Sequence, residues 1–229
     1  MELKIRDIVD LLQVSEKTVY RWIKDNKIPC YRINHQYRFN RTEINEWILS
    51  NKIELSSSLI NIAISEEQDN LTRLIERGGI IPGIHGENVP DVLKNAVQAI
   101  NTPPNKSKEV ILNALLSREE LMPTAIGKGI AIPHPRNPII TDISSASVSI
   151  CYLEKPVDFG SLDNLPVKTL FILITESPKM HLAVLSKISY LCSNETFLTM
   201  LNEQVPEERL LEYVRLKELD WQKRESARK

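Results

Sequence analysis

The chain has 229 residues, of which 42% are hydrophobic and 26% charged, so it is long enough for two domains and at least one sizeable core. Its 29 basic and 30 acidic residues nearly cancel, which excludes a globally basic protein and leaves only a local patch for binding nucleic acid. The three cysteines, Cys30, Cys151 and Cys192, are far apart and form no CxxC pair, which argues against a disulfide framework and a zinc site.

The N-terminal stretch MELKIRDIVD carries charges where a signal peptide has an apolar run, and the run around Leu170 to Ile174 is too short to cross a bilayer. We therefore expect a cytoplasmic protein without membrane insertion. Because the sequence contains no metal-ligand, nucleotide or glycine-rich phosphate-loop motif, we expect no metal and no cofactor.

The first residues predict two short helices joined by a turn. Apolar residues recur at helical spacing in IRDIVDLL (5–12) and again in SEKTVYRWIKDN (15–26). Between them lie Gln13 and Val14, and Ser15 stands where the second helix needs an N-cap. This is the layout of a helix-turn-helix.

A hairpin and a third helix are predicted to follow. KIPCYRINHQYRF (27–39) mixes β-branched and aromatic residues around the polar residues 34–36, which is typical of two short strands that would form a wing. Asn40 is predicted to cap a third helix, and Trp47 on its apolar face is expected to pack against Trp22.

Cations dominate this segment between positions 15 and 41, where only Glu16 and Asp25 oppose seven basic residues. A recognition helix uses short polar side chains and long cations near its start to reach base edges and phosphates. The candidate DNA-binding residues are Ser15, Lys17, Thr18, Tyr20, Arg21 and Lys24 in the helix, and Arg32 and Arg38 in the wing. The alternative is that these charges form a solvated face of a module that binds protein.

The stretch VSEKTVYRWIKDNKIPCYRINHQYRFNRTEINEWI (14–48) resembles the excisionase or MerR-like winged helix-turn-helix family. The resemblance covers about the first fifty residues and implies DNA binding through the second helix and the wing.

We expect four segments in the chain: a winged helix-turn-helix domain at 1–51, a linker at 52–70, a second domain at 71–215 and a polar helical tail at 216–229. In the second domain, predicted strands such as 125–133 and 165–175 alternate with helical segments. This alternation indicates an α+β or α/β fold with a mixed sheet.

Chemistry is suggested by GKGIAIPHP (127–135). The apolar residues predict a buried strand that ends at Pro133, because proline cannot donate to a ladder. His134 would then face outward from the strand end, where a partner could reach it, and a neutral imidazole is a competent nucleophile toward phosphorus. A lone histidine in this position is, however, more often an ordinary loop residue. Lys128 could attract a phosphate or simply be solvated.

The stretch LLSREELMPTAIGKGIAIPH (115–134) resembles the type-2 enzyme IIA domains of the bacterial phosphotransferase system, in particular the nitrogen-regulatory IIA proteins. The resemblance continues through LDNLPVKTLFILIT and HLAVLSKIS and covers roughly residues 71 to 215. It implies that His134 is the phosphoryl acceptor, that His181 is a neighbouring histidine and that Arg118 is a cation beside the phosphate. Pro135 departs from the family, which commonly has a small residue there, and it lacks the N–H that could bind phosphate.

The combination predicts a transcription regulator that accepts a phosphoryl group on His134 from a phosphohistidine carrier protein and changes its DNA binding in response. A homodimer is expected, because helix-turn-helix proteins usually bind paired half-sites. Three alternatives stay open: a IIA phosphocarrier whose N-terminal module docks protein, a DNA-binding regulator whose sensor domain is not phosphorylated, and a repressor that senses a small ligand.

Overall fold

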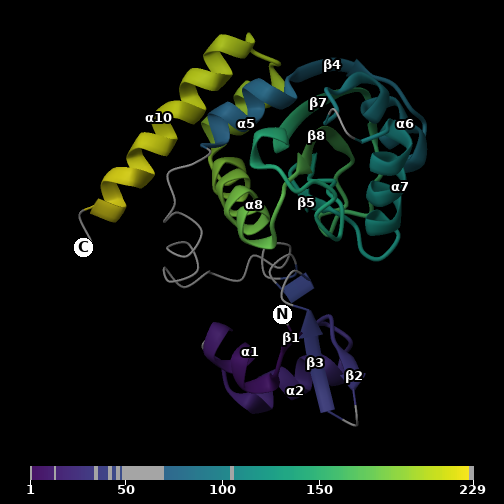
Figure 1. Cartoon of the computed structure of the whole chain (residues 1–229), viewed down its shortest axis with the longest axis vertical. Coiled ribbons are helices and arrows are strands. Elements are labelled where there is room, and N and C mark those ends of the chain that lie inside the picture. The colour runs from purple at the N-terminus through teal and green to yellow at the C-terminus, as the bar shows by residue number, and fades with distance from the viewer. Residues whose placement is uncertain are drawn as a thin grey trace. The chain divides into compact units, whose positions relative to one another are not determined.

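The computed structural model describes residues 2–12, 14–33, 36–40, 43–44, 47, 70–103 and 106–226. The chain divides into two compact units, Met1–Ile62 and Ala63–Lys229, which are drawn in Figure 1. Within the described ranges, no helix is long and apolar enough to cross a membrane.

The N-terminal unit contains the predicted helix-turn-helix and wing. Its elements are β1 (Glu2–Leu3), α1 (Ile5–Leu12), α2 (Glu16–Lys24), β2 (Tyr31–Ile33) and β3 (Gln36–Asn40). The strands form an antiparallel sheet in the order β1-β3-β2. The Ser15 side chain accepts the N–H of Thr18 at 3.2 Å, which confirms the predicted N-cap of α2.

The third predicted helix is described only in part. Asn40, its expected cap, is the last residue of β3 and pairs with Glu2. Glu43, Ile44 and Trp47 are helical. The remaining residues of this helix, the hairpin turn at 34–35 and the linker residues 52–69 lie outside the described part of the chain.

A small core holds the N-terminal unit together. Ile8 of α1, Val19 of α2 and Phe39 of β3 are fully buried in one apolar cluster. Trp22 and Trp47 lie edge to face with their ring centroids 5.3 Å apart, as the sequence predicts. This cluster fixes α2 against the wing, so the exposed residues of both elements keep a defined spacing.

The second unit consists of helices around one sheet (Figure 1). Its elements are α5 (Leu71–Gly78), β4 (Ile80–Ile84), α6 (Val89–Ala99), α7 (Lys108–Glu119), β5 (Ala125–Gly127), β6 (Ile130–Ala131), the 3-10 helix Ile143–Ser145, β7 (Ser147–Val157), β8 (Val167–Ile174), α8 (Pro178–Cys192), α9 (Glu195–Asn202) and α10 (Glu207–Ser226).

The sheet is mixed and has the strand order β4-β7-β8-β6-β5. Neighbours are parallel in the pairs β4–β7 and β6–β8 and antiparallel in the pairs β7–β8 and β5–β6. Figure 1 shows α5, α8 and α10 on one side of the sheet and α6 and α7 on the other. This confirms the predicted mixed-sheet α/β architecture.

Two features of the second unit differ from the sequence analysis. The eight-residue helix α9 was not predicted, because ETFLTMLN is short and follows directly on α8. Residues 216–226, predicted as part of a polar helical tail, are the helical continuation of α10, but Glu218 and Trp221 are buried there. The C-terminal helix therefore belongs to the packed structure of this unit.

Candidate functional site

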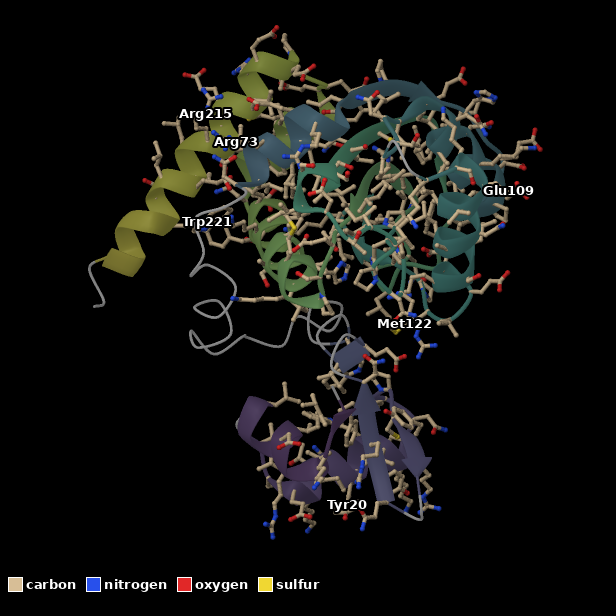
Figure 2. All side chains as sticks on the ribbon, viewed as in Figure 1. Tyr20, Arg73, Glu109, Met122, Arg215 and Trp221 are labelled. Atoms are coloured by element: carbon tan, nitrogen blue, oxygen red, sulfur yellow. The ribbon has the colours of Figure 1, made fainter. Side chains whose placement is uncertain are left out.

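The helix α2 presents the predicted DNA-contacting residues on one exposed surface. Lys17, Tyr20, Arg21 and Lys24 are exposed, and Thr18 is half-buried beside the cap Ser15. Figure 2 shows the side chain of Tyr20 on this helix, and it is 46% exposed. Because a recognition helix reads DNA with residues in its first turns, the surface has the composition and placement that this role requires.

The wing joins this surface through aromatic contacts. The guanidinium of Arg32 lies 4.6 Å from the centre of the Tyr37 ring and donates to the Tyr37 hydroxyl at 3.0 Å. The Tyr37 ring meets that of Tyr20 edge to face, with centroids 6.2 Å apart. The cation of the wing is thus connected to α2 through the Tyr37 ring. Tyr37 is not among the predicted DNA-contacting residues, although an aromatic residue next to Arg38 was the available signal.

Arg38 is ordered by its own strand. Its guanidinium donates to the side-chain carbonyl of Gln36 at 2.7 Å and to the backbone oxygen of Tyr37 at 3.1 Å. The Arg38 side chain is half-buried, and both of these hydrogen-bond partners belong to β3, so its guanidinium lies against the wing. Arg32 and Arg38 therefore add two positioned cations to those of α2.

In the second unit, three residues from different elements meet in one buried cluster. Arg118 comes from the last turn of α7, His134 follows strand β6, and His181 lies in the first turn of α8. The Arg118 Nε–H donates to His134 Nε2 at 3.1 Å. The two imidazole rings have their centroids 4.5 Å apart. The structure thus brings together the three residues that the sequence analysis proposed for phosphate chemistry.

The prediction that His134 faces outward is wrong. Its side chain is only 2% exposed, and those of Arg118 and His181 are 4% and 5% exposed. Arg118 of α7 and His181 of α8 lie against the imidazole. The backbone just before His134 is also held, because Leu173 N–H donates to the Pro133 oxygen at 2.9 Å.

The hydrogen bonds of His134 indicate which tautomer its neutral ring adopts. Nδ1 lies 2.7 Å from the backbone oxygen of Ile132. A carbonyl oxygen can only accept, so Nδ1 carries the hydrogen, and in the neutral ring Nε2 keeps the lone pair. The donation from Arg118 to Nε2 agrees with this tautomer. The lone pair of the His134 ring is therefore on Nε2.

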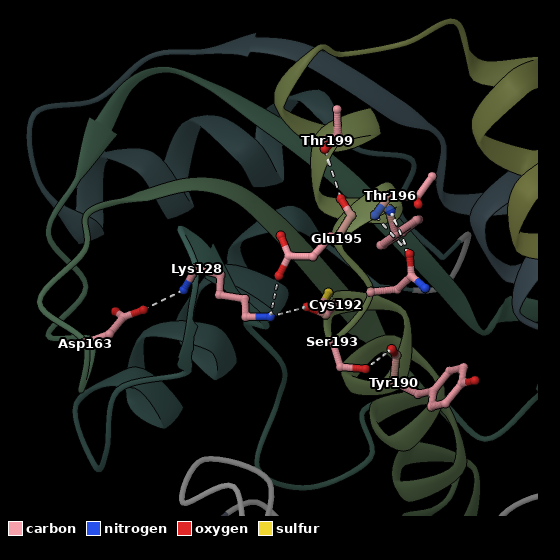
Figure 3. Close-up of polar contacts among 10 residues, drawn as sticks. Lys128, Asp163, Tyr190, Cys192, Ser193, Glu195, Thr196 and Thr199 are labelled. Carbon is pink, nitrogen blue, oxygen red and sulfur yellow. Dashed lines mark hydrogen bonds and ion pairs between the residues drawn. The ribbon is translucent and has the colours of Figure 1, made fainter.

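Lys128 does not join this cluster. Figure 3 shows its backbone N–H bound to the carboxylate of Asp163 and its ammonium directed to the Cys192 oxygen and to Glu195. The hairpin turn between β5 and β6 is thereby braced against the β7–β8 loop and the junction of α8 and α9. Lys128 positions the hairpin that leads to His134.

The cysteines of the second unit are unsuited to nucleophilic chemistry. Burial raises the pKa of the Cys151 thiol to about 12 and raises that of Cys192 further, although the charge of Lys128 partly opposes the shift at Cys192. The thiolate is the reactive form of cysteine. At neutral pH both side chains therefore act as small apolar groups in the core.

Taken together, a mixed five-stranded sheet with two histidines and an arginine gathered at one strand end is the arrangement of a IIA-type phosphotransferase domain, here preceded by a helix-turn-helix unit. Comparison with known families agrees. Residues 73–217 match the family model described as "Phosphoenolpyruvate-dependent sugar phosphotransferase system, EIIA 2", and residues 2–52 match the model "Helix-turn-helix domain". The chain belongs to the EIIA type-2 family and carries an N-terminal helix-turn-helix domain.

Curated relatives of the second unit are named nitrogen regulatory proteins. The protein of Klebsiella oxytoca is 34% identical over 110 residues, which are 47% of this chain and 67% of the relative. That of Escherichia coli (strain K12) is 32% identical over 121 residues, 52% of this chain and 71% of the relative.

A solved structure supports the fold. The nitrogen regulatory protein IIA-Ntr from Neisseria meningitidis superposes with a TM-score of 0.56 at 23% identity, covering 62% of this chain and 97% of the other.

Proposed function

We propose that this protein is a cytoplasmic transcription regulator of the phosphotransferase system, in which His134 accepts a phosphoryl group and the helix-turn-helix unit binds DNA. The observation that carries the proposal is the buried arrangement of Arg118 and His181 around a His134 ring whose Nε2 holds the lone pair. The donor is a phosphohistidine carrier protein.

The transfer step needs few groups. The Nε2 lone pair of His134 attacks the phosphorus, a P–N bond to His134 forms, the P–N bond to the carrier breaks, and the carrier imidazole leaves. Phosphoryl transfer depends mainly on positioning and charge stabilisation. Before the reaction, Arg118 Nε–H donates a hydrogen bond to the Nε2 lone pair. The guanidinium must therefore move away from Nε2 as the phosphoryl group arrives. It can then donate hydrogen bonds to the phosphoryl oxygens.

His181 stabilises the product in this proposal. Its ring lies against that of His134 and can donate a hydrogen bond to a phosphoryl oxygen. His181 also belongs to the first turn of α8, and the N-terminal end of a helix favours negative charge. Arg118 and α8 therefore supply positive potential from two sides.

Phosphate transfer tests the chemical half of the proposal. The purified chain is incubated with a ³²P-labelled phosphohistidine carrier protein, and acid-labile label is measured. We expect label in the wild type and in His85→Ala, because His85 is exposed in a turn of the same unit. Label should be absent from His134→Ala. Label that persists in His134→Ala would refute the assignment of the acceptor.

Pro135 offers a test of the alternative in which the domain is a sensor that is not phosphorylated. Proline has no N–H to offer a phosphoryl oxygen, and Pro135→Gly restores one. We expect Pro135→Gly to accept phosphate faster than the wild type. Should neither protein accept label from carriers that charge other IIA domains, the unphosphorylated sensor is the correct function.

DNA binding tests the other half. The wild type should enrich a sequence motif from random DNA, and its affinity should fall steeply with salt as counterions are released. Arg21→Ala should weaken binding and reduce the salt slope by about 1. Arg73→Ala, which removes an exposed arginine from α5 of the second unit, is the matched control and should change neither. Absence of any enriched motif would favour the protein-docking alternative.

The two halves are connected by the charge of the phosphate. A phosphoryl group adds close to two negative charges, and a change in protein packing or in dimerisation would couple these to DNA affinity. The coupling is tested by comparing the phosphorylated and unphosphorylated chains in two measurements: the dissociation constant for DNA, and the molecular mass determined by sedimentation, which reports dimerisation. Equal values in both states would leave phosphorylation without a role in DNA binding.

A further inference from the structure

Glu119, the residue after Arg118, makes a pair of hydrogen bonds to a single residue. One carboxylate oxygen accepts the backbone N–H of Thr124 at 2.9 Å, and the other accepts the Thr124 hydroxyl at 2.6 Å. Burial raises the pKa of Glu119, while the two bonds from Thr124 and the charge of Arg118 oppose that shift. A half-buried carboxylate that accepts two donors from one residue sets the position of that residue closely.

Thr124 passes this position on to the candidate acceptor. Its backbone oxygen accepts the N–H of Ile132 at 3.0 Å, and the backbone oxygen of Ile132 lies 2.7 Å from His134 Nδ1. Three consecutive hydrogen-bonded steps therefore lead from the Glu119 carboxylate to the imidazole.

The prolines make this connection important. Pro133 and Pro135 flank His134, and neither has a backbone N–H with which to fix the loop. The N–H of Ile132 is the last amide before Pro133, and its partner is the oxygen that Glu119 holds in place through Thr124. The direction of the Ile132 carbonyl, and with it the tautomer of His134, depends on this bond.

We propose that Glu119 is a positioning residue for phosphoryl acceptance: through Thr124 it aims the Ile132 carbonyl at Nδ1 of His134, so that Nε2 keeps its lone pair. This inference rests on the proposed function of His134. The consecutive residues Arg118 and Glu119 at the end of α7 then have separate roles. Arg118 contacts the imidazole directly, and Glu119 fixes the backbone to which Nδ1 is hydrogen-bonded.

The tautomer of His134 is the direct readout, because a purely structural role of Glu119 would not change it. The full-length chain is labelled with ¹⁵N-histidine, and the imidazole signals are assigned by their loss in His134→Ala. The wild type should show a protonated Nδ1 and an unprotonated Nε2. Glu119→Gln, which retains a single side-chain acceptor and presents an amide N–H to Thr124, should give a mixture of both tautomers.

Phosphate transfer is the second readout. Loss of a residue that orients a reactive side chain typically costs about 10- to 100-fold in activity, and we expect a decrease in this range for Glu119→Gln. Thr124→Ser keeps both donors and should match the wild type in tautomer and rate. Glu120→Gln changes the charge of the exposed neighbour and should also match the wild type.

The outcomes separate this inference from the proposed function. If Glu119→Gln keeps the wild-type tautomer, Glu119 does not position His134, even where the wild type accepts phosphate. If the wild type accepts no phosphate but Glu119→Gln still changes the tautomer, the positioning holds and the proposed function fails. Should Glu119→Gln not fold, Thr124→Val removes only the hydroxyl donor, and an unchanged tautomer in that variant would overturn the inference.

Discussion

At the scale of single residues, the candidate site depends on which hydrogen bonds a residue can still make. Pro133 and Pro135 remove two backbone donors around His134, and the imidazole turns back to the Ile132 oxygen. Arg118 meets the remaining nitrogen and also donates to the Met122 oxygen at 2.6 Å. Backbone groups therefore determine which ring nitrogen holds the lone pair as much as side chains do.

The hairpin that leads to His134 depends on Gly127. Its φ of 87° lies in the left-handed region, and a Cβ there would lie 2.8 Å from a carboxylate oxygen of Asp163, the residue that binds Lys128 N–H. We expect Gly127→Ala to lower the free energy of unfolding by about 2 kcal/mol, from backbone strain and displacement of Asp163.

Gly83→Ala is the matched control. Gly83 also has a positive φ, of 70°, but among the described residues no heavy atom lies within 4 Å of the point that an added Cβ would occupy. We expect Gly83→Ala to lower the free energy of unfolding by about 1 kcal/mol, from backbone strain alone. Equal losses in urea denaturation of the two variants would mean that Asp163 does not crowd the turn.

At the scale of elements, the C-terminal helix closes the second unit. Glu218 of α10 accepts the backbone N–H groups of Leu71 and Thr72 at 2.5 and 3.1 Å and the Thr72 hydroxyl at 2.7 Å. The ammonium of Lys187 in α8 forms an ion pair with the Glu218 carboxylate, with an N–O distance of 3.3 Å. Figure 2 shows Trp221 of α10 on the side of α8, where its ring meets that of Tyr190.

Glu218 should therefore be a strong determinant of stability. Removing one partner of a buried ion pair leaves the other charge and the N-terminal N–H groups of α5 unsatisfied. We expect Glu218→Ala to reduce the free energy of unfolding by about 3 kcal/mol, as measured by urea denaturation. Glu212→Ala, at an exposed position of the same helix, should change it by less than about 0.5 kcal/mol. Similar losses in both variants would show that Glu218 contributes no more than surface charge.

At the scale of the whole molecule, the chain is two units with separate cores. Such units can unfold separately, and a single transition is then not expected. The tryptophans allow a test, because Trp22 and Trp47 lie in the first unit and Trp221 in the second. In Trp221→Phe, fluorescence reports on the first unit alone, whereas far-ultraviolet circular dichroism mainly follows the larger second unit.

We expect the fluorescence and circular dichroism curves of Trp221→Phe to have different urea midpoints. The first unit buries a smaller core, so its transition should come at the lower urea concentration. Coincident curves would show that the two units unfold as one cooperative body.

Local signals in the sequence predicted most of the elements. Ser15 marks the start of α2, which the structure contains. The apolar run at 165–175 located the strand β8. These features act within a few residues of where they stand, which is why sequence alone suffices for them.

By itself, the sequence determined most of the elements, the family of each domain and the three residues at the strand end. Only the tertiary structure decided that His134 is buried, that its Nε2 holds the lone pair, and that Glu119, Tyr37 and Glu218 have defined partners. The reason is physical. The burial of His134 and the hydrogen bonds of Glu218 depend on α5, α7, α8 and α10, which come from distant parts of the chain. Glu119 and Tyr37 bond to residues five positions away, but these contacts form only once the chain between the partners has folded back.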